Sequence, residues 1–393
     1  MKYLIVGGVA GGASTAARLR RLDEESRIIM LERGDHISYA NCGLPYYIGE
    51  VIDEREKLLI QTPESFAARF NVEVRVRSDV RALSLTLKSV VVQDLVTRKY
   101  YEESYDKLIL APGAVPVFPV LEGMGLNRIF ILRGMHDSDA IKAFIDTCHV
   151  KRVLIVGAGF IGLEMAENLH ELGIQVTIIE KEDQVMAQVD YEIVTAIHQH
   201  CKAKGVELYL QQKVKSFNRM EDDRIKATLE SGLEFQVDMV ILSMGTYPDV
   251  CLVEGVGLEI GMTGGIKVNE FLQTSNEDVY AVGDAIEFPN PVSNSPALAF
   301  LAGPANKQGR ICADNLVYGN CRKYKGAVGT MIAKFFDLTI GATGLSAKML
   351  DRMNIPYKEI VVHGASHAGY YPGATMMDIK INFSPKDGKL LGA

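Results

Sequence analysis

The sequence predicts an α/β protein built on two Rossmann-like units, and an internal duplication is the main observation behind this prediction. An apolar strand that runs into a Gly-rich turn and then a helix is expected over Tyr3–Arg21, and the same pattern recurs over Val153–Leu172. Each copy returns to an apolar strand that ends in an acid, Glu32 in the first and Glu180 in the second. A strand, a crossover helix and a parallel strand form a βαβ unit, so two such units are expected.

The composition excludes several classes of function. The 393 residues include 42 Lys and Arg against 49 Asp and Glu, and the net charge of −7 leaves no basic surplus for nucleic-acid phosphates. No apolar run reaches the roughly 20 residues that a membrane span needs, so we expect a soluble, cytoplasmic protein with no nucleic-acid or membrane partner. The six cysteines are scattered without paired spacing, so neither a metal site nor a disulfide framework is expected.

The second Gly-rich turn carries the dinucleotide fingerprint. The spacing Gly157-x-Gly159-x-x-Gly162 allows a tight turn, a close backbone approach to a pyrophosphate, and contact between helix and strand. Glu180 follows about twenty residues later, where a carboxylate binds the ribose hydroxyls of NADH and repels the 2′-phosphate of NADPH. The strand, helix and acid in register favour a nucleotide site over a Gly-rich turn in an unrelated α/β unit. NADH is the preferred cofactor and NADPH is possible.

The first Gly-rich turn departs from that pattern, because Val9 stands where the second glycine is expected. Four glycines still permit a tight turn that faces a phosphate. They are Gly7, Gly8, Gly11 and Gly12. Glu32 is the expected ribose-binding acid of this unit, although it also fits a solvated strand end.

A third strand-like run, Val279–Val282, leads into Gly283-Asp284. A carboxylate at the end of a buried strand can bind a hydroxyl of a flavin ribityl chain, and the alternative is an ordinary turn aspartate. Ala111-Pro112-Gly113 breaks regular structure between the two nucleotide units. A helix is expected over Gly303–Leu316, and strands are expected from about Gly326 to the end of the sequence.

The order of these elements resembles that of the FAD-dependent pyridine nucleotide-disulfide oxidoreductases, which carry FAD on the first unit and the nicotinamide on the second. Three segments are similar to the coenzyme A-disulfide reductases and to the related single-cysteine NADH oxidases and persulfide reductases. These segments are Ser38–Tyr47, Leu301–Arg310 and His367–Gly373, and the resemblance runs from Met1 to Ala393. Besides the glycines and ribose acids above, it implies cofactor-binding roles for Arg33, Ala111, Pro112, Gly113, Phe160, Glu164, Gly283, Asp284, Leu301 and Ala302. Phe160 and Glu164 equally fit packing positions.

The resemblance also implies the domain organisation. The FAD-binding domain is expected in two parts, residues 1–115 and 248–323, around an NADH-binding domain at residues 116–247. Residues 324–393 are expected to form an α+β interface domain that is truncated, because relatives continue past this point with helices that complete the domain. A homodimer is expected if that domain is complete.

Cys42 is the candidate redox thiol. A cysteine is a nucleophile as its thiolate, and a helix N-terminus lowers the pKa of a thiol. We expect Asn41 to cap a short helix after Cys42, although Cys42 also fits a small buried apolar residue. The next ten residues hold no second cysteine, so the oxidised form is expected to be a mixed disulfide or a sulfenic acid. Related peroxidases have a histidine in the first glycine turn, and its absence from Val9-Ala10-Gly11 favours thiol substrates over peroxide.

An acidic protein needs a local basic patch to hold the phosphates of coenzyme A. Arg18 and Arg21 lie three residues apart on the first expected helix and share a face, which also fits an ordinary solvated surface. Part of the family has a basic residue where Phe70 stands, with Arg69 beside it. The resemblance places further substrate contacts at Ser14, Ser38, Asn41, Asn306 and Arg310.

Tyr370 and Tyr371 are candidate catalytic residues, because a phenol can protonate a departing thiolate. Neighbouring residues of a strand face opposite sides, so one of the two is expected to belong to the core. The resemblance makes one of them a catalytic or substrate contact across a dimer interface, and both residues remain candidates.

We therefore expect an FAD-dependent enzyme that passes electrons from NAD(P)H through flavin and Cys42 to a low-molecular-weight disulfide, with coenzyme A disulfide as the substrate. Coenzyme A is expected either as substrate or as a bound mixed disulfide. Three alternatives stay open: an NADH oxidase that reduces oxygen, an NADH-dependent persulfide or polysulfide reductase that binds coenzyme A, and a flavin-bound sensor or electron donor to a protein. The last is disfavoured, because such a donor needs no cysteine beside the flavin.

Overall fold

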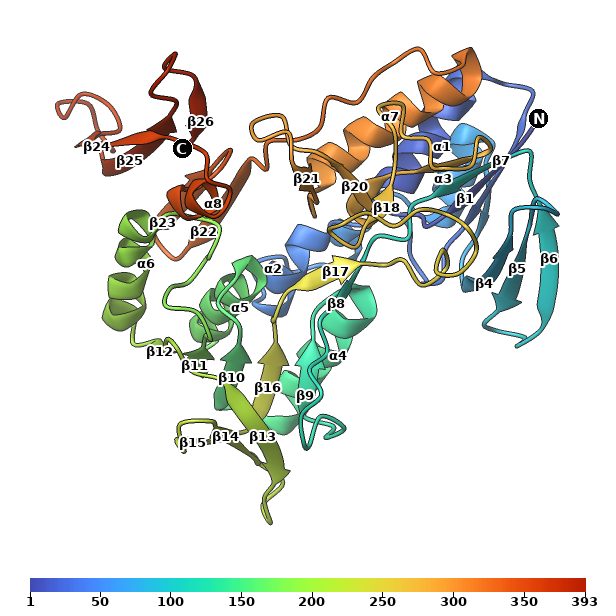
Figure 1. Cartoon of the computed structure of the whole chain (residues 1–393). Coiled ribbons are helices and arrows are strands. Elements are labelled where there is room, and N and C mark those ends of the chain that lie inside the picture. The colour runs from blue at the N-terminus through green and yellow to red at the C-terminus, as the bar shows by residue number, and fades with distance from the viewer. The chain divides into compact units, whose positions relative to one another are not determined.

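The computed structural model describes all residues from Met1 to Ala393, and the chain folds into two compact units (Figure 1). Unit 1 consists of residues 1–41, 54–115 and 246–327. Unit 2 consists of residues 42–53, 116–245 and 328–393. Each unit is therefore assembled from segments that lie far apart in the sequence.

A five-stranded parallel sheet forms the centre of unit 1. In spatial order its strands are β19 (Val279–Ala281), β7 (Lys107–Leu110), β1 (Lys2–Val6), β2 (Arg27–Leu31) and β3 (Glu73–Arg75). Because β1 has a parallel neighbour on each side, its Leu4 and Ile5 are fully buried. The carboxyl ends of β1, β7 and β19 meet at one edge of this sheet, where the first Gly-rich turn begins.

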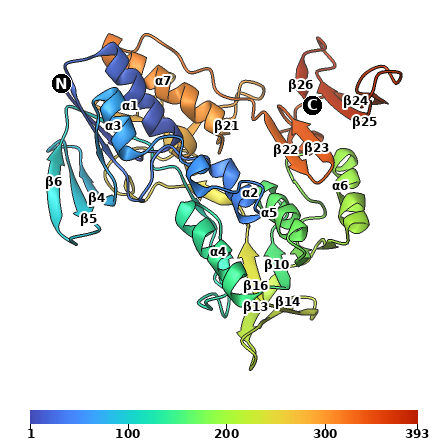
Figure 2. The same ribbon diagram turned by 180° about the vertical axis from the view of Figure 1, so that it is seen from behind.

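Helices α1 (Ala10–Leu22) and α7 (Ala302–Tyr318) of unit 1 lie side by side in Figures 1 and 2. Their approach is close, since a Cβ on Gly309 would lie 2.6 Å from the carbonyl oxygen of Gly11. The remaining elements wholly within unit 1 are η2 (Arg55–Leu58), α3 (Pro63–Phe70), β4 (Ser78–Ser84), β5 (Ser89–Asp94), β6 (Tyr100–Ser104), β17 (Thr246–Pro248), β18 (Ile266–Lys267), η3 (Gly283–Ala285), β20 (Ile286–Pro289) and β21 (Pro296–Ala297). The chain crosses between the units within η1 (Asn41–Gly43) and β8 (Ala114–Pro116).

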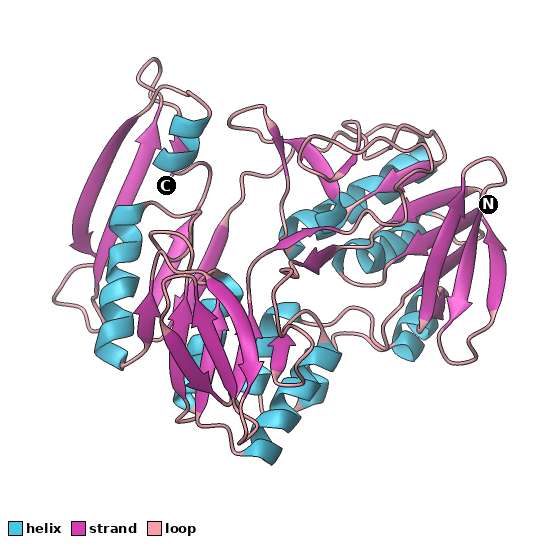
Figure 3. Ribbon diagram, turned by 60° about the horizontal axis from the view of Figure 1, so that its bottom comes forward, coloured by secondary structure: helices cyan, strands magenta, loops and turns pink.

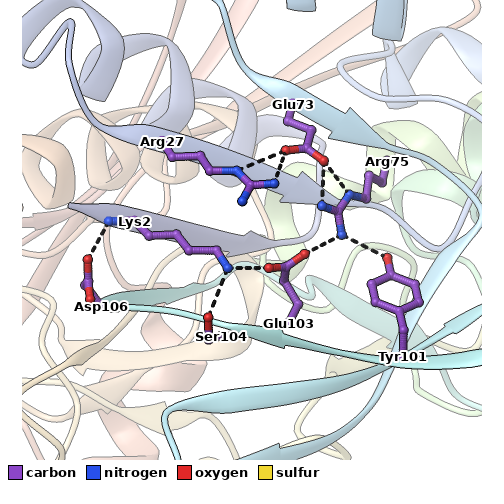
Figure 4. Close-up of polar contacts among 8 residues, drawn as sticks. All are labelled: Lys2, Arg27, Glu73, Arg75, Tyr101, Glu103, Ser104 and Asp106. Atoms are coloured by element: carbon purple, nitrogen blue, oxygen red, sulfur yellow. Dashed lines mark hydrogen bonds and ion pairs between the residues drawn. The ribbon is translucent and has the colours of Figure 1, made fainter.

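A polar network connects the parallel sheet of unit 1 to the antiparallel sheet β4–β5–β6, which stands near the N-terminus in Figure 3. Glu103 on β6 pairs with Lys2 of β1 and with Arg75 of β3, whose Nη1 lies 2.6 Å from Glu103 Oε2 (Figure 4). Arg75 also reaches Glu73 at 2.5 Å, and Glu73 pairs with Arg27 at 2.8 Å. These alternating charges satisfy one another and fix the two sheets together.

A second five-stranded parallel sheet forms the centre of unit 2. In spatial order its strands are β12 (Glu207–Tyr209), β11 (Gln175–Ile179), β10 (Arg152–Val156), β16 (Met239–Leu242) and β9 (Ile129–Ile131). The helices of this part are α4 (Met135–Cys148), α5 (Phe160–Glu171), α6 (Tyr191–Lys204) and the short α2 (Leu44–Ile48), and an antiparallel sheet is formed by β13 (Val214–Arg219), β14 (Ile225–Leu229) and β15 (Glu234–Val237). Although α2 is distant in sequence, it packs against α4 and α5.

The C-terminal part of unit 2 is mostly strands. It contains β22 (Met331–Phe335), β23 (Leu338–Ala342), α8 (Ala347–Arg352), β24 (Lys358–Ala365), β25 (Met376–Phe383) and β26 (Leu390–Gly392). Lys380 of β25 is 4% exposed, and its Nζ lies 2.8 Å from Glu359, 3.0 Å from Glu192 and 3.6 Å from Asp190. Because Asp190 and Glu192 begin α6, this buried cation attaches the C-terminal sheet to the first turn of that helix.

The expected fold class is confirmed, with helix and strand bounds close to those expected. The helix expected over Gly303–Leu316 extends over Ala302–Tyr318 as α7. The short helix expected after Cys42 is present as α2, but the expected cap is wrong, because the N-cap residue is Gly43 and Asn41 lies in the preceding 3₁₀ turn. No helix in the chain is long and apolar enough to cross a membrane.

Candidate functional site

The first Gly-rich turn requires glycine for reasons internal to the protein. Gly7 has a φ of +100°, and a Cβ there would lie 2.0 Å from the carbonyl oxygen of Ala111. A Cβ on Gly12 would lie 1.8 Å from the carbonyl oxygen of Gly7. Helix α1 begins directly after Val9, which makes no side-chain cap bond. The first N–H groups of α1 are therefore left for an anion at the turn.

The second turn repeats this geometry in unit 2. Gly157 has a φ of +107° and a virtual Cβ 2.3 Å from the carbonyl oxygen of Ser243, and a Cβ on Gly162 would lie 2.0 Å from the carbonyl oxygen of Gly157. Gly159 differs, because a Cβ there would meet no protein atom within 4 Å. The protein itself does not demand glycine at 159, and the open space lets a ligand approach the backbone closely.

The two acids hold equivalent positions beside the turns. Glu32 Oε2 accepts a hydrogen bond of 2.8 Å from the Gly8 N–H, and Oε1 accepts one of 2.8 Å from the Gly34 N–H. Glu180 Oε2 accepts a hydrogen bond of 2.7 Å from the Ala158 N–H, and its Oε1 accepts one of 2.9 Å from the Glu182 N–H. Each carboxylate is thus fixed at a strand end next to a Gly-rich turn. Both turns fit the pyrophosphate and ribose of a dinucleotide.

The other predicted cofactor residues of unit 1 gather at the same sheet edge. The Gly283 N–H donates a 2.7 Å hydrogen bond to the fully buried Gln308, and a Cβ on Gly11 would lie 3.0 Å from Val282 Cγ2. Ala111, Pro112 and Gly113 follow β7, Asp284 lies in η3, Leu301 is the N-cap of α7, and Ala302 is its first residue. Strands β1, β7 and β19 thus place these segments around the first turn.

Arg33 lies beside Glu32 but is directed by another residue. Its Nη2 lies 2.8 Å from Oδ2 of Asp249, which is mostly buried, and the Asp249 N–H donates to the Gly113 carbonyl. Burial is the largest single effect and lowers the Arg33 pKa, but the carboxylates of Asp249, Glu32 and Asp79 together leave this pKa raised overall. Arg33 therefore connects the Glu32 strand end to the segment after β7.

Cys42 is the first residue of unit 2, and the residue before it ends the first segment of unit 1. It lies in the 3₁₀ turn before α2, and part of its side chain is exposed. Burial of the thiol, followed by the negative charge of Glu164, raises the pKa of Cys42. The expected lowering of this pKa is wrong, because burial of the thiol, followed by the charge of Glu164, outweighs the single backbone hydrogen bond that favours the thiolate.

Other ionisable groups of unit 2 surround Cys42, and the sequence pattern alone does not reveal them. Burial and the neighbouring Glu167 raise the pKa of Glu164 to about 7. Glu167 is 5% exposed; its Oε1 pairs with Lys334 Nζ at 2.7 Å, and its Oε2 has no hydrogen-bond partner. Burial, followed by Glu164 and Glu167, raises the pKa of Tyr46 to about 12. Phe160 is the first residue of α5, the helix that carries both glutamates.

Some of the predicted substrate residues of unit 1 connect α1 to α7, and the others do not. Ser14 donates a 2.7 Å hydrogen bond to Asn306, and Arg18 Nε lies 2.8 Å from Asp314 Oδ1, so these side chains connect α1 to α7. Arg310 is exposed on α7. Asn41 ends the first segment of unit 1, and Ser38, at a φ of +46°, donates its N–H to the Gly8 carbonyl.

Arg21 lies in a basic and aromatic cluster with Arg69 and Phe70. The Arg21 guanidinium carbon lies 5.6 Å from the centre of the Phe70 ring, and that of Arg69 lies 5.2 Å away. Arg20, which lies beside them, donates to five backbone carbonyls, those of Phe70, Asp23, Glu24, Ser26 and Asn71. A surface hollow of about 570 Å³ is lined by Arg20, Arg21, Glu24, Ala68, Arg69, Phe70 and Asn71. Arg20 binds backbone carbonyls around this hollow, and Arg21 contributes a guanidinium group to its lining.

Tyr370 and Tyr371 lie in the connection between β24 and β25, where they are 92% and 66% exposed. The expectation that one of them is core is wrong, because neither lies in a strand. The Tyr371 ring contacts His367 edge to face at 5.8 Å.

Comparison with known proteins gives one consistent family. The sequence profile of the pyridine nucleotide-disulphide oxidoreductases matches residues 1–303. The chain is 35% identical over 392 residues to the coenzyme A disulfide reductase of Staphylococcus haemolyticus, covering 100% of this chain and 87% of that protein.

Two solved structures are closely similar over 100% of this chain. Reduced CoADR-RHD of Bacillus anthracis has 48% identity and a TM-score of 0.97, with 70% of that chain covered. The NAD-dependent persulfide reductase of A. fulgidus has 30% identity and a TM-score of 0.96, with 73% of that chain covered.

Proposed function

Because this chain belongs to the pyridine nucleotide-disulphide oxidoreductase family and is a flavoprotein disulfide reductase, we propose that it passes electrons from NADH through FAD and Cys42 to coenzyme A disulfide. The observation that carries the proposal is a single cysteine in the turn before α2, with the next cysteine of the sequence only at position 148. A lone thiol of this kind forms a mixed disulfide with a small thiol rather than an internal disulfide with a near neighbour.

The two Gly-rich turns would hold the cofactors. In unit 1 the N-terminus of α1 and Glu32 would bind the pyrophosphate and ribose of FAD, and in unit 2 the N-terminus of α5 and Glu180 would bind those of NADH. When bound, FAD supplies a two-electron relay from NADH to a disulfide, which no side chain of this protein provides. The protein positions the reactants, excludes water and manages protons.

Cys42 would carry the substrate chemistry. Its thiolate attacks one sulfur of coenzyme A disulfide, a new disulfide forms between Cys42 and that sulfur, and one coenzyme A leaves as its thiolate. The next two-electron reduction returns Cys42 to the thiol state and releases the second coenzyme A. Tyr370 and Tyr371, as exposed phenols, are proposed donors of a proton to a departing thiolate.

The choice of coenzyme A is supported by the cluster of Arg21, Arg69 and Phe70. Two guanidinium groups held over the half-buried Phe70 ring can bind phosphate groups and stack on a nucleobase, and coenzyme A carries both. This basic hollow lies on a chain of net charge −7, so it is a local exception to the overall acidity. The remaining proposed substrate contacts are Ser14, Arg18, Ser38, Asn41, Asn306 and Arg310.

We also propose that residues 324–393 act as an interface domain in a homodimer. The antiparallel strands β24 and β25 expose several large apolar side chains, which a second copy could cover. These include Ile360, Val362, Met376 and Met377. The domain limits 1–115, 116–247 and 248–323 are kept as proposed limits for the cofactor-binding parts.

Steady-state NADH oxidation tests the proposal against its alternatives. With purified holoenzyme, coenzyme A disulfide should support the fastest turnover, with two thiols formed for each NADH. Cys42→Ser should keep bound flavin and lose this activity. Turnover of that variant at the normal rate with coenzyme A disulfide would contradict the proposal.

A persulfide reductase is the second candidate, because a solved structure at 30% identity and a TM-score of 0.96 is a NAD-dependent persulfide reductase. In that case NADH oxidation would be faster with a persulfide or polysulfide than with coenzyme A disulfide. An NADH oxidase would instead consume oxygen with NADH and no added disulfide, and it would form no thiol product. The Cys42→Ser substitution would change this rate of oxygen consumption.

A further inference from the structure

The segment between β11 and α6, residues 181–189, is bonded to the second Gly-rich turn. Its Met186 N–H donates a 3.0 Å hydrogen bond to the carbonyl oxygen of Ala158, which lies between the first two glycines of the motif. The N–H of Ala158 donates to Glu180 at 2.7 Å. Ala158 is therefore held on one side by the end of β11 and on the other by this segment, so the shape of the turn depends on where the segment lies.

The segment adopts a conformation that its own residues do not favour. Met186 has a φ of +46°, in the left-handed region that a side chain disfavours. Val185 and Met186 are fully buried, and Gln184 is 3% exposed. The Gln184 side chain donates a 2.8 Å hydrogen bond to the Val189 carbonyl. Because a buried backbone N–H without an acceptor is costly, each N–H of this segment needs a partner.

The Val185 N–H has its partner on another element. It donates a 3.3 Å hydrogen bond to Nε2 of His198, a half-buried residue of α6. The next N–H along the chain, that of Met186, is the one bound to Ala158. His198 therefore acts one peptide away from the Gly-rich turn. A neutral imidazole with its proton on Nδ1 can accept this bond, whereas an imidazolium has no free lone pair and would direct an N–H at the Val185 N–H.

We propose that His198 is a positioning residue for the dinucleotide: as a neutral imidazole it holds residues 181–189 against the second Gly-rich turn, and its protonation weakens binding of the adenosine diphosphate half of NADH. This rests on the proposed NADH site in unit 2. The only chemical change is the uptake of one proton by Nε2, with loss of the Val185 bond. Acid should therefore reduce the affinity for the cofactor and leave the nicotinamide end unaffected.

The groups that face His198 are consistent with this role. Burial is the largest effect and lowers the pKa of His198, while the charge of Asp183 opposes it. Asp183 Oδ1 also lies 3.4 Å from Nζ of Lys348 on α8, which offsets part of its charge. The Tyr191 ring contacts the imidazole edge to face, with 6.1 Å between the ring centres. His198 is therefore neutral at neutral pH and takes up a proton only in acid.

The test measures binding of ADP-ribose to the FAD-loaded enzyme by calorimetry, at about pH 7.5 and about pH 5. ADP-ribose carries the adenosine and the diphosphate but no nicotinamide, and its diphosphate holds no proton that titrates in this range. The parent is compared with His198→Gln, with His198→Leu and with His136→Gln, a control at an exposed histidine of α4. The rate of flavin reduction at saturating NADH and the melting temperature are measured in parallel.

The parent and His136→Gln should bind ADP-ribose about tenfold more weakly at the lower pH, because the imidazolium no longer accepts the Val185 N–H. His198→Gln should bind tightly at both pH values, since its amide oxygen accepts a hydrogen bond and does not titrate. His198→Leu should bind about tenfold more weakly than the parent at about pH 7.5 and show little further loss in acid. Flavin reduction at saturating NADH should be the same in all four proteins.

A pH dependence in His198→Gln equal to that of the parent would overturn the proposal, because another group would then be titrating. This comparison decides the matter even if His198→Leu does not fold. Parent affinity in a folded His198→Leu would overturn it as well. Failure of the proposed NADH site is separately visible, since the parent would then bind no ADP-ribose in competition with NADH even at about pH 7.5.

Discussion

At the scale of single residues, the glycines of the two turns have different reasons to be glycine. The motif spacing predicts all of them alike, because a sequence pattern does not distinguish a clash inside the protein from space kept for a ligand. A Cβ on Gly162 would meet the Gly157 carbonyl at 2.0 Å, whereas one on Gly159 would meet nothing within 4 Å. In the first turn Val9 takes the place that Gly159 has in the second, so the first turn tolerates a side chain at this position.

Gly159→Ala should fold normally and bind NADH poorly. Its melting temperature should match that of the parent, while KM for NADH rises about tenfold, equivalent to about 1.4 kcal/mol. Gly162→Ala should instead lower the unfolding free energy by about 2 kcal/mol or more, because the backbone of α5 must move. Thermal unfolding and NADH kinetics measure both effects. Equal behaviour of the two variants would contradict the distinction.

Glu180 is predicted to determine the choice between the two nicotinamide cofactors. Its carboxylate is fixed by two backbone N–H groups at the end of β11, where it would face a 2′-phosphate. Glu180→Ala should reduce the ratio of kcat/KM for NADH to that for NADPH about tenfold, or roughly 1.4 kcal/mol of lost discrimination. Glu171→Ala, at an exposed position of α5, serves as the control. An unchanged ratio in Glu180→Ala would exclude this role.

The pKa of Cys42 illustrates what local sequence does not contain. The residues around Cys42 suggest a helix N-terminus and therefore a more acidic thiol, and α2 does follow. The opposing charge comes from Glu164, which the fold brings near from a distant part of the sequence. The same holds for the pair of Glu167 and Lys334, whose partners come from α5 and β22.

At the scale of elements, α1 shows how adjacent arginines take different roles. Arg20 donates to five carbonyls around the ends of α1 and α3, while Arg21 lies over the Phe70 ring. Helical spacing predicts which residues share a face, but the bonds of Arg20 depend on the αL residue Asn71 at the end of α3, which no periodicity predicts.

Arg20→Ala should therefore destabilise the protein, and Arg21→Ala should not. Loss of the Arg20 bonds should reduce the unfolding free energy by about 2 kcal/mol, since several carbonyls lose a charged donor. Arg21→Ala should stay within about 0.5 kcal/mol of the parent and raise KM for coenzyme A disulfide. Denaturant unfolding and steady-state kinetics of both variants check this pair. A stable Arg20→Ala protein would refute the structural role.

The contact between β22 and α5 should set the proton affinity of Glu164. Lys334→Met removes the cation that compensates Glu167, so Glu167 repels the charge of Glu164 more strongly and the pKa of Glu164 rises. The fall in unfolding free energy that accompanies ionisation of Glu164 should therefore move to higher pH, and Lys334→Arg should restore it. An unchanged pH dependence in Lys334→Met would show that Lys334 has no such influence.

At the scale of the whole molecule, the sequence predicts the two nucleotide-binding sheets well, because each consists of strongly apolar strands with a recurring turn. It does not predict how the segments are grouped. Residues 42–53 fold with unit 2, although they lie between segments of unit 1. That grouping depends on the packing of α2 against α4 and α5, a contact between surfaces that a linear pattern does not encode.

The half-buried Glu164 of unit 2 should also affect the stability of the protein. The pKa of Glu164 is about 7 in the folded state against an ordinary value of 4.5, so its protonated form favours folding. This contribution is fully present below pH 4.5 and is lost as the pH rises through 7. The unfolding free energy of the parent should therefore fall relative to that of Glu164→Gln across this range. Parallel pH dependences of the two proteins would contradict the raised pKa.

The most direct measurement is the mass of the Cys42 peptide in holoenzyme treated with coenzyme A disulfide, before and after one equivalent of NADH without oxygen. The account predicts a coenzyme A adduct on Cys42 that disappears on reduction, with one coenzyme A released for each NADH. An adduct on a different cysteine, or one on Cys42 that survives NADH, would contradict it.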